Sequence, residues 1–178
     1  MPNIVTTQRR HDACGHEAGH AVVAWRLGLP LSDVTVLSVG ADAAVSEFDG
    51  ETELNMGQLV MHLDPGGVRD DGRYRDLIAY YIGGEIGQRG NWSGKVTHDA
   101  PSAGKFAARL VPSDPDSVIA ERVGYVKQLL LVDCQAQHYL LRDTLLGLPT
   151  DPNTAWHVPL AYMSEIQIRQ LLGDPPPR

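Results

Sequence analysis

The alternation of apolar and polar residues in the first part of the chain predicts one helix followed by one strand. Apolar residues recur with helical spacing from His11 to Leu27, and Gly28 followed by Pro30 is typical of a helix end. Residues 33–39 alternate and are rich in β-branched side chains, which predicts a strand. The polar residues 1–10 are expected to form a flexible lead-in before the helix.

The rest of the chain is expected to be mainly helical. Between Gly40 and Leu63 the pattern indicates one or two further strands, with a turn near Asp49-Gly50. Helical spacing then predicts four helices, over residues 74–88, 100–111, 114–146 and 161–172, before a flexible tail at 173–178. In the first of these, Gly83-Gly84 weakens the helix unless close packing requires small residues. We therefore expect a single α+β domain over residues 1–178, mainly α-helical, with a small N-terminal β-sheet.

Composition and charge argue against several classes of protein. The chain has 178 residues and a formal net charge of −7, with few lysines and scattered arginines, so we expect no nucleic-acid partner. It contains neither a long apolar run nor an apolar N-terminal stretch, so we expect no membrane span and no secretory signal. Cys14 and Cys134 are too few for a disulfide framework. These features predict a cytoplasmic protein.

The residues His16-Glu17-Ala18-Gly19-His20 form an HExxH motif on the first predicted helix. Residues i and i+4 of a helix point the same way, so both imidazoles can bind one ion. Glu17 lies beside them and can act as a general base towards water on that ion. The alternative is a coincidence of composition, with the histidines on an exposed helix face or capped in the core. The position of the motif on a helix favours a metal site, with Zn²⁺ as the expected cofactor.

A catalytic zinc ion needs a third protein ligand, which spacing alone does not identify. The candidates are His62, Glu85, His98 and Asp99. The residues after His20 lack the HExxHxxGxxH extension, which disfavours a metzincin. Asp99 comes at the start of the predicted helix over residues 100–111, where exposed amides favour a carboxylate, but a plain N-cap explains it equally well.

The stretch HEAGHAVVAWRLGLPLSDVTVLSVG, residues 16–40, resembles the start of the peptidase domain of FtsH-type ATP-dependent zinc metalloproteases. Weaker similarities follow in the order of that family at residues 82–86, 96–99, 107–111 and 163–166. The resemblance implies an FtsH peptidase-like zincin fold and places Asp99 on the aspartate that is the third zinc ligand of the family. Members also carry a membrane anchor and an ATPase ring. This sequence contains no GxxxxGK[ST] motif, so we expect cleavage that is independent of ATP.

The resemblance also implies roles for residues around the metal. Glu85 matches an acid that accompanies the metal helix and would orient a ligand imidazole, with a surface helix glutamate as the alternative. His98 stands where the family usually has an asparagine. Three roles remain open for it: support of a metal ligand from outside the coordination sphere, contact with substrate, or a solvated loop residue without a role in the site. Residues 43–48, which include Val45 and Ser46, lie where the family has its substrate-edge strand. Such a strand would receive an extended peptide, and an ordinary core strand is the alternative.

These features predict a zinc-dependent metalloendopeptidase that hydrolyses peptides or unfolded segments of a polypeptide substrate. Glu17 would deprotonate water and then pass the proton to the leaving amine. The alternative is a catalytically silent, metal-containing module derived from such a peptidase, which binds peptides or has a regulatory role. A third interpretation is hydrolysis of an amide in a small molecule. The sequence leaves open a homo-oligomer and a separate ATPase partner.

Overall fold

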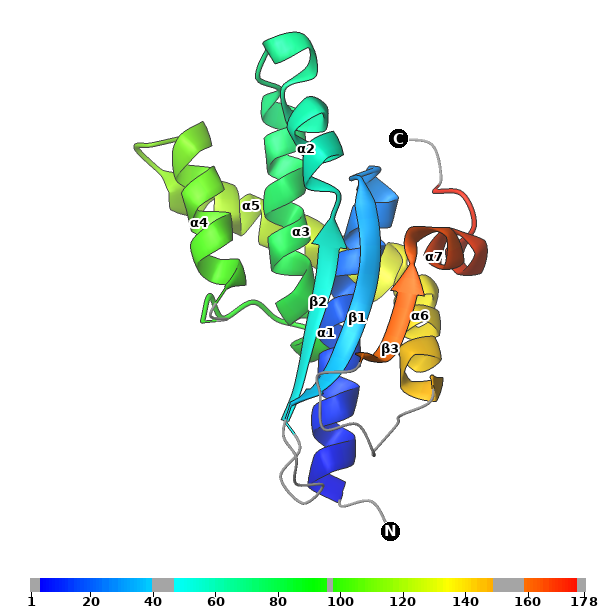
Figure 1. Cartoon of the computed structure of the whole chain (residues 1–178). Helices are drawn as coiled ribbons and strands as arrows, with labels where there is room; N and C mark the ends of the chain where they lie inside the picture. Colours follow the sequence, from blue (N-terminus) through cyan, green and yellow to red (C-terminus); the bar gives the residue numbers. More distant parts are fainter. Residues whose placement is uncertain (1–3, 40–46, 96–97, 149–158, 176–178) are drawn as a thin grey trace.

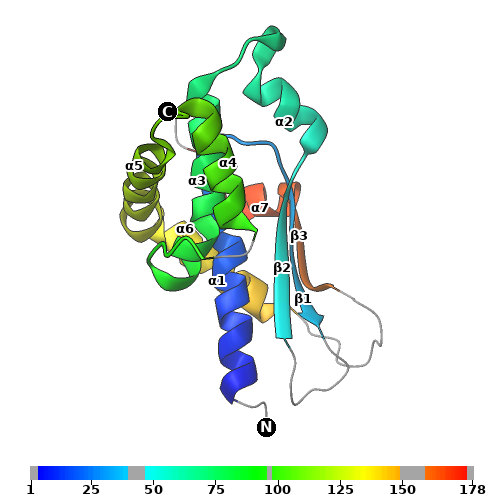
Figure 2. The ribbon, with the colours of Figure 1, turned by 90° about the vertical axis from the view of Figure 1, so that its left-hand side faces the viewer.

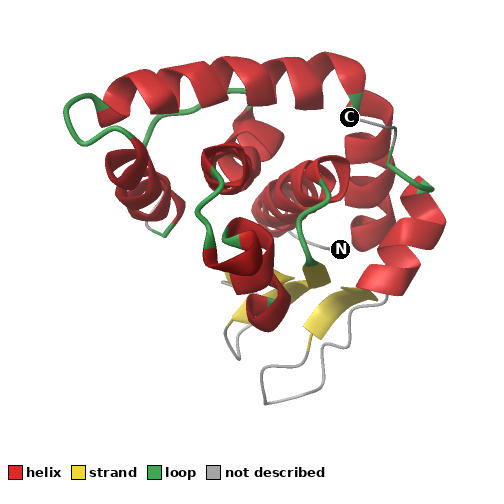
Figure 3. Cartoon of the chain, turned by 90° about the horizontal axis from the view of Figure 1, so that it is seen from above, coloured by secondary structure: helices red, strands yellow, loops and turns green. Residues whose placement is uncertain are grey.

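The chain folds into a group of helices packed on one small sheet (Figure 1), in a computed structural model that describes residues 4–39, 47–95, 98–148 and 159–175. Three antiparallel strands form the sheet in the order β2-β1-β3, where β1 is Leu31–Val39, β2 is Glu47–Leu54 and β3 is Pro159–Ser164. Seen from above, the strands lie along one side of the molecule and the helices gather on the other (Figure 3). The fold class is therefore α+β and mainly helical, as predicted.

The helices are α1 (Ile4–Leu27), α2 (Met56–Leu63), α3 (Asp71–Arg89), α4 (Asp99–Leu110), α5 (Pro115–Gln128), α6 (Gln135–Gly147) and α7 (Glu165–Leu172). A 3-10 turn, η1 (Pro65–Gly67), follows α2, and a π-helical turn, η2 (Leu129–Asp133), joins α5 to α6. In the described part of the chain, none of the helices is long and apolar enough to cross a membrane.

Helix α1 contains the predicted first helix but begins earlier, so the expectation of a flexible lead-in is wrong for residues 4–10. Arg10 accounts for part of this difference, because its guanidinium Nη2 donates to the carbonyl oxygen of Leu148 at 2.9 Å. This bond ties the start of α1 to the end of α6. The predicted helix end is confirmed, since the chain turns at Gly28 with a φ of 63°, a left-handed conformation that favours glycine.

Two predictions for residues 40–63 are wrong. Asp49-Gly50 forms no turn, because both residues lie inside β2 and pair with β1. Residues 56–63 form α2 rather than a strand. The side chain of Asn55 caps this helix by accepting a hydrogen bond from a backbone amide of its first turn, and a cap of this kind stabilises a short helix.

The start of the last predicted helix is also wrong. Residues 159–164 form β3, so the third strand of the sheet comes from the C-terminal part of the chain and the sheet is not only N-terminal. A capping box between Ser164 and Gln167 then starts α7 at Glu165. Buried Ala161 and Met163 alternate with exposed Tyr162, which is the period-two pattern of a half-buried strand.

The helix predicted over residues 114–146 is interrupted by η2. Its buried side chains Val126, Leu130, Cys134 and His138 recur every four residues. A continuous α-helix has 3.6 residues per turn, so this spacing would rotate the buried stripe by about 40° at each step. The wider π turn takes up the excess and keeps the stripe on the core.

The register of the sheet decides which side chains of β2 face the helices. Val34 and Val36 of β1 are fully buried and pair with Thr52 and Gly50 of β2. Directly paired residues point to the same face of a sheet, so Thr52 and Gly50 also face inwards. Figure 2 views the sheet from its β2 edge, with α1 and α3 on the inner side.

Helices α1 and α3 cross at glycines. An added Cβ on Gly19 would lie 2.3 Å from the carbonyl oxygen of Gly83, and one on Gly87 would lie 2.6 Å from that of Gly15. The two backbones are therefore in direct contact, which is the close packing that explains glycines inside α3. This crossing holds the HEAGH turn of α1 against α3.

Gly19→Ala is expected to lower the free energy of unfolding by roughly 1–3 kcal/mol, the usual cost of overpacking, although alanine has the better helix propensity. The measurement is urea denaturation of the metal-free protein. Gly124→Ala in α5 is the matched control, because nothing lies within 4 Å of the added Cβ there. The control should stabilise the protein by about 0.5–1 kcal/mol. An equal gain from both substitutions would contradict the close crossing.

Candidate metal centre

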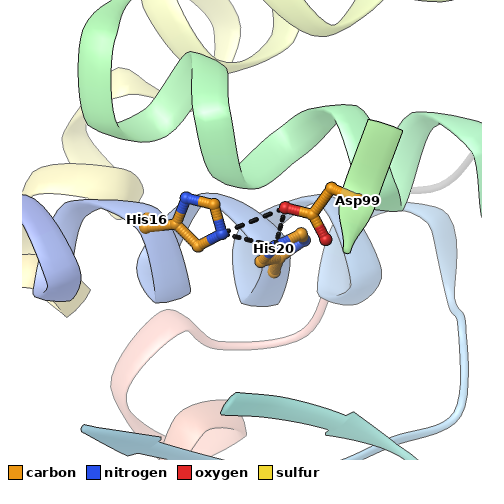
Figure 4. Close-up of side chains that lie close together, drawn as sticks. All are labelled: His16, His20 and Asp99. Atoms are coloured by element: carbon orange, nitrogen blue, oxygen red, sulfur yellow. Dashed lines mark hydrogen bonds and ion pairs between the residues drawn. The ribbon is translucent and has the colours of Figure 1, made fainter. Parts of the chain in front are cut away.

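Helix α1 directs His16 and His20 towards the same point. The two residues lie one turn apart, and their Nε2 atoms are 3.1 Å from each other (Figure 4). The rings meet edge to face, with their centroids 4.7 Å apart. Two nitrogens at this separation cannot both carry a proton towards each other, so at least one must present a lone pair. The local helix geometry thus produces the paired donors that the sequence predicted.

Asp99, the first residue of α4, joins the pair from a distant part of the chain. Its Oδ2 lies 3.1 Å from Nε2 of His16 and 3.2 Å from Nε2 of His20. The N-cap of α4 is His98, whose side chain makes no capping hydrogen bond. Asp99 is therefore not a plain N-cap: one carboxylate oxygen completes a triangle with the two imidazole nitrogens.

The triangle fits a zinc ion. Tetrahedral zinc with bonds of about 2.0–2.1 Å separates its ligand atoms by roughly 3.3 Å. The three separations here are 3.1, 3.1 and 3.2 Å. Two imidazoles and one carboxylate are also a donor set that suits zinc, and three protein ligands would leave a fourth position open. In the described residues, no other group of three or more histidines, cysteines or acids is placed to hold a metal ion.

Gly84 of α3 makes room for the donors. A Cβ at this position would lie 2.3 Å from Nε2 of His20 and 2.5 Å from Nε2 of His16. The backbone of α3 therefore passes close to the two nitrogens, where any side chain would clash with them. The glycine pair noted in the sequence thus has two separate uses, since Gly83 packs against α1 and Gly84 faces the donors.

Tyr80 fixes the orientation of one of the candidate ligands. Nδ1 of His20 lies 2.7 Å from the backbone carbonyl oxygen of Tyr80. Because a carbonyl only accepts, Nδ1 carries a proton and donates it, so in the neutral ring it is Nε2 that presents its lone pair to the centre. A backbone carbonyl has no signature in the sequence, so only the fold could identify this contact.

The electrostatics of the centre favour an ionised carboxylate. Burial opposes the charge on Asp99, but its hydrogen bonds to His16 and His20 outweigh burial and lower the pKa of Asp99 well below its usual value. For His20, burial likewise disfavours the charged ring, and the hydrogen bond and charge of Asp99 outweigh it and raise the pKa of the imidazole. A carboxylate held ionised in this way is ready to act as a metal ligand.

Glu17 lies on the side of α1 that faces β2. It is 3 % exposed, and its Oε2 accepts a hydrogen bond of 2.7 Å from Oγ1 of Thr52. Burial raises the pKa of Glu17, against the opposing effect of the nearby His20 and His16. A raised carboxylate pKa brings the group closer to the range in which a general base both accepts and releases a proton near neutrality.

The other predicted site residues lie outside the triangle. Glu85 is fully buried, so the surface-glutamate alternative is wrong, and its carboxylate accepts hydrogen bonds from Ser93 and from the amide of Gly94 rather than from an imidazole. It therefore holds the loop between α3 and Asp99. His98 is exposed.

The remaining candidates add no ligand to this centre. His62, a third-ligand candidate, lies on α2 and does not join the group. Val45 and Ser46, the predicted substrate-strand residues, lie outside the described residues. The contacts of Thr52, Tyr80 and Gly84 were missed. For Thr52 a signal existed, because it alternates with exposed Glu51 and Glu53 and so belongs to the inner face of a strand.

The sequence matches no model of a known protein family and no curated protein. The chemistry of the centre is therefore argued from its own residues. Two imidazoles, an ionised carboxylate and a second, buried carboxylate one residue from His16 form an arrangement that could bind a divalent ion and move a proton beside it.

Proposed function

We propose that the protein is a zinc-dependent peptidase, in which His16, His20 and Asp99 bind the metal and Glu17 is the general base. The single observation that carries the proposal is the triangle of two Nε2 atoms and one carboxylate oxygen, with edges of 3.1–3.2 Å. Glu17 supports a catalytic rather than a structural role, because a purely structural zinc site has no use for an adjacent base.

The mechanism assigns one role to each residue. A zinc ion bound at the triangle supplies polarisation of the scissile carbonyl and activation of water. The carboxylate of Glu17 accepts the proton of the attacking water and then donates it to the leaving amine nitrogen as the C–N bond breaks. The carbonyl of Tyr80 keeps the ring of His20 in the orientation that presents Nε2 throughout this cycle.

Peptides and unfolded polypeptide segments are the proposed substrates. β2 is an edge strand, and its inward residues Gly50 and Thr52 lie against Glu17. An edge strand is a place where an extended peptide can bind by adding a strand. This geometry favours an extended chain over a folded protein or a small amide.

The resemblance to FtsH-type peptidases supports the same proposal. In this chain a HEAGH helix is followed by β1 and later by an aspartate at the start of α4, which is the order that the resemblance implies. We therefore propose an FtsH peptidase-like arrangement within the α+β fold.

A catalytically silent metal module is the second candidate, and one observation favours it. Glu17 is almost fully buried and already accepts a hydrogen bond from Thr52, as a residue with only a structural role would. The two candidates differ in one measurable property. A silent module binds zinc without cleaving peptides at any zinc concentration.

Removing the metal tests the proposal. The purified protein is expected to contain one zinc ion per chain and to cleave a quenched fluorescent peptide library or an unfolded protein. Chelation should abolish cleavage, and added zinc should restore it, because the carbonyl is not polarised without the ion. Zinc content is measured by elemental analysis and cleavage by fluorescence and mass spectrometry. Cleavage that survives complete removal of zinc would refute the proposal, and stoichiometric zinc without cleavage would establish the silent module.

A further inference from the structure

Thr52 donates a side-chain hydrogen bond to the Glu17 carboxylate. Its Oγ1 lies 2.7 Å from Oε2 of Glu17 and 3.1 Å from the backbone oxygen of the same residue. A threonine hydroxyl has one proton to donate, and the shorter contact with a charged acceptor is the stronger one. Both side chains are buried, so water does not compete for this bond.

The backbone of β2 also confines Glu17. A Cβ on Gly50 would lie 2.4 Å from Cγ and 2.6 Å from Oε1 of Glu17. Gly50 and Thr52 are two residues apart on the inner face of β2, so the strand contacts the glutamate at two successive inward positions. The stem and Oε1 of Glu17 lie against Gly50, while Oε2 accepts the hydrogen bond from Thr52.

Tyr80 links this contact to the metal ligands. Its hydroxyl donates to the backbone oxygen of Thr52, and its own backbone oxygen accepts from Nδ1 of His20. One residue of α3 therefore sets both the position of Thr52 on β2 and the orientation of a ligand ring on α1. The edge strand and the HEAGH turn are joined into one unit by buried hydrogen bonds.

We infer that Thr52 is a positioning residue, which holds the Glu17 carboxylate in the orientation needed for proton transfer, with Tyr80 anchoring Thr52. The inference rests on the proposed peptidase function and deepens it. A free glutamate side chain samples many rotamers, and fixing it in advance removes that entropic cost from the reaction.

Thr52→Val tests the inference, since valine keeps the shape and strand propensity of threonine but has no donor. We expect kcat to fall roughly 10–100-fold, as for loss of a supporting hydrogen bond at a metal site, with KM within about twofold and zinc content unchanged. Thr52→Ser should recover most of the lost kcat because it restores the donor. In a Glu17→Gln background, Thr52→Val should cause no further loss, because the two residues act as one unit.

Thr35→Val is the matched control. Thr35 lies on β1 between the buried residues Val34 and Val36, so it faces the opposite side of the same sheet, away from Glu17. This variant should leave kcat, KM and zinc content unchanged. Tyr80→Phe probes the anchor independently and keeps the test decisive if Thr52→Val fails to fold; it should lower kcat several-fold with KM unchanged.

The outcomes separate this inference from the proposed function. An inactive Glu17→Gln variant together with an unimpaired Thr52→Val variant would overturn the inference alone. A serine variant no better than the valine variant, or a loss that appears only in KM, would also overturn it. If Glu17→Gln cleaves as well as the parent, the proposed function itself fails, whatever the result for Thr52.

Discussion

Replacing Glu17 with glutamine is expected to abolish peptide cleavage and leave zinc bound. Glutamine has the same shape and its amide oxygen can still accept the hydrogen bond from Thr52, but it cannot take a proton from water. Loss of general-base catalysis is expected to lower kcat by a factor on the order of 10²–10⁴. Zinc should remain at one ion per chain, because Glu17 is not among the three residues of the donor triangle.

Glu53→Gln is the matched control for this experiment. Glu53 is an exposed glutamate one residue after Thr52 on β2, so the same change of charge occurs close to the site without touching it. Cleavage by the control should equal that of the parent. If the Glu17 and Glu53 variants cleave at the same rate, Glu17 is not the general base and the proposed mechanism is wrong.

Removing the carboxylate of Asp99 is expected to remove zinc. Asp99→Ala leaves only two imidazole donors, and two neutral ligands without a charged one bind the ion much more weakly. The affinity for zinc should fall by more than the ~10–100-fold that loss of an outer-shell partner costs. The measurement is competition for zinc with a chelator of known affinity, with peptide cleavage measured at the same zinc concentrations.

Asp116→Ala is the matched control, because Asp116 is an exposed aspartate in the first turn of α5. It loses only the favourable interaction of a carboxylate with a helix start, about 0.3–1 kcal/mol, and should retain zinc. Gly84→Ala reaches the centre by another route, since its methyl group would lie 2.3 Å from Nε2 of His20. It should also lose zinc although all three donors remain. Unchanged zinc content in Asp99→Ala would remove Asp99 from the ligand set.

Several corrections show where sequence patterns misled. Asp49-Gly50 has the composition of a turn, but Gly50 is needed inside β2 because its Cα lies against Glu17 and no side chain fits there. Residues 161–164 alternate with the period of a strand, but this segment is short. The helical pattern of the residues after it therefore dominated the prediction. In each case a contact with a distant segment decided the structure.

The HEAGH helix could be predicted from the sequence because its geometry is local. Helix hydrogen bonds connect residues four apart, so the same four-residue spacing that forms the helix also brings His16 and His20 together. The helix end at Gly28 and the strand that follows are local for the same reason. The pairing of two imidazoles therefore depends on no other part of the chain.

Asp99, Thr52 and Tyr80 reach the centre only through the tertiary structure. Spacing left four candidates for the third ligand, and the resemblance alone favoured Asp99, which is 79 residues from His20. Its approach depends on the glycine crossing of α1 and α3, on the loop held by Glu85 and on the start of α4. Such contacts join segments whose separation in the chain carries no periodicity, so the sequence by itself determined the paired histidines and their helix, while packing decided what surrounds them.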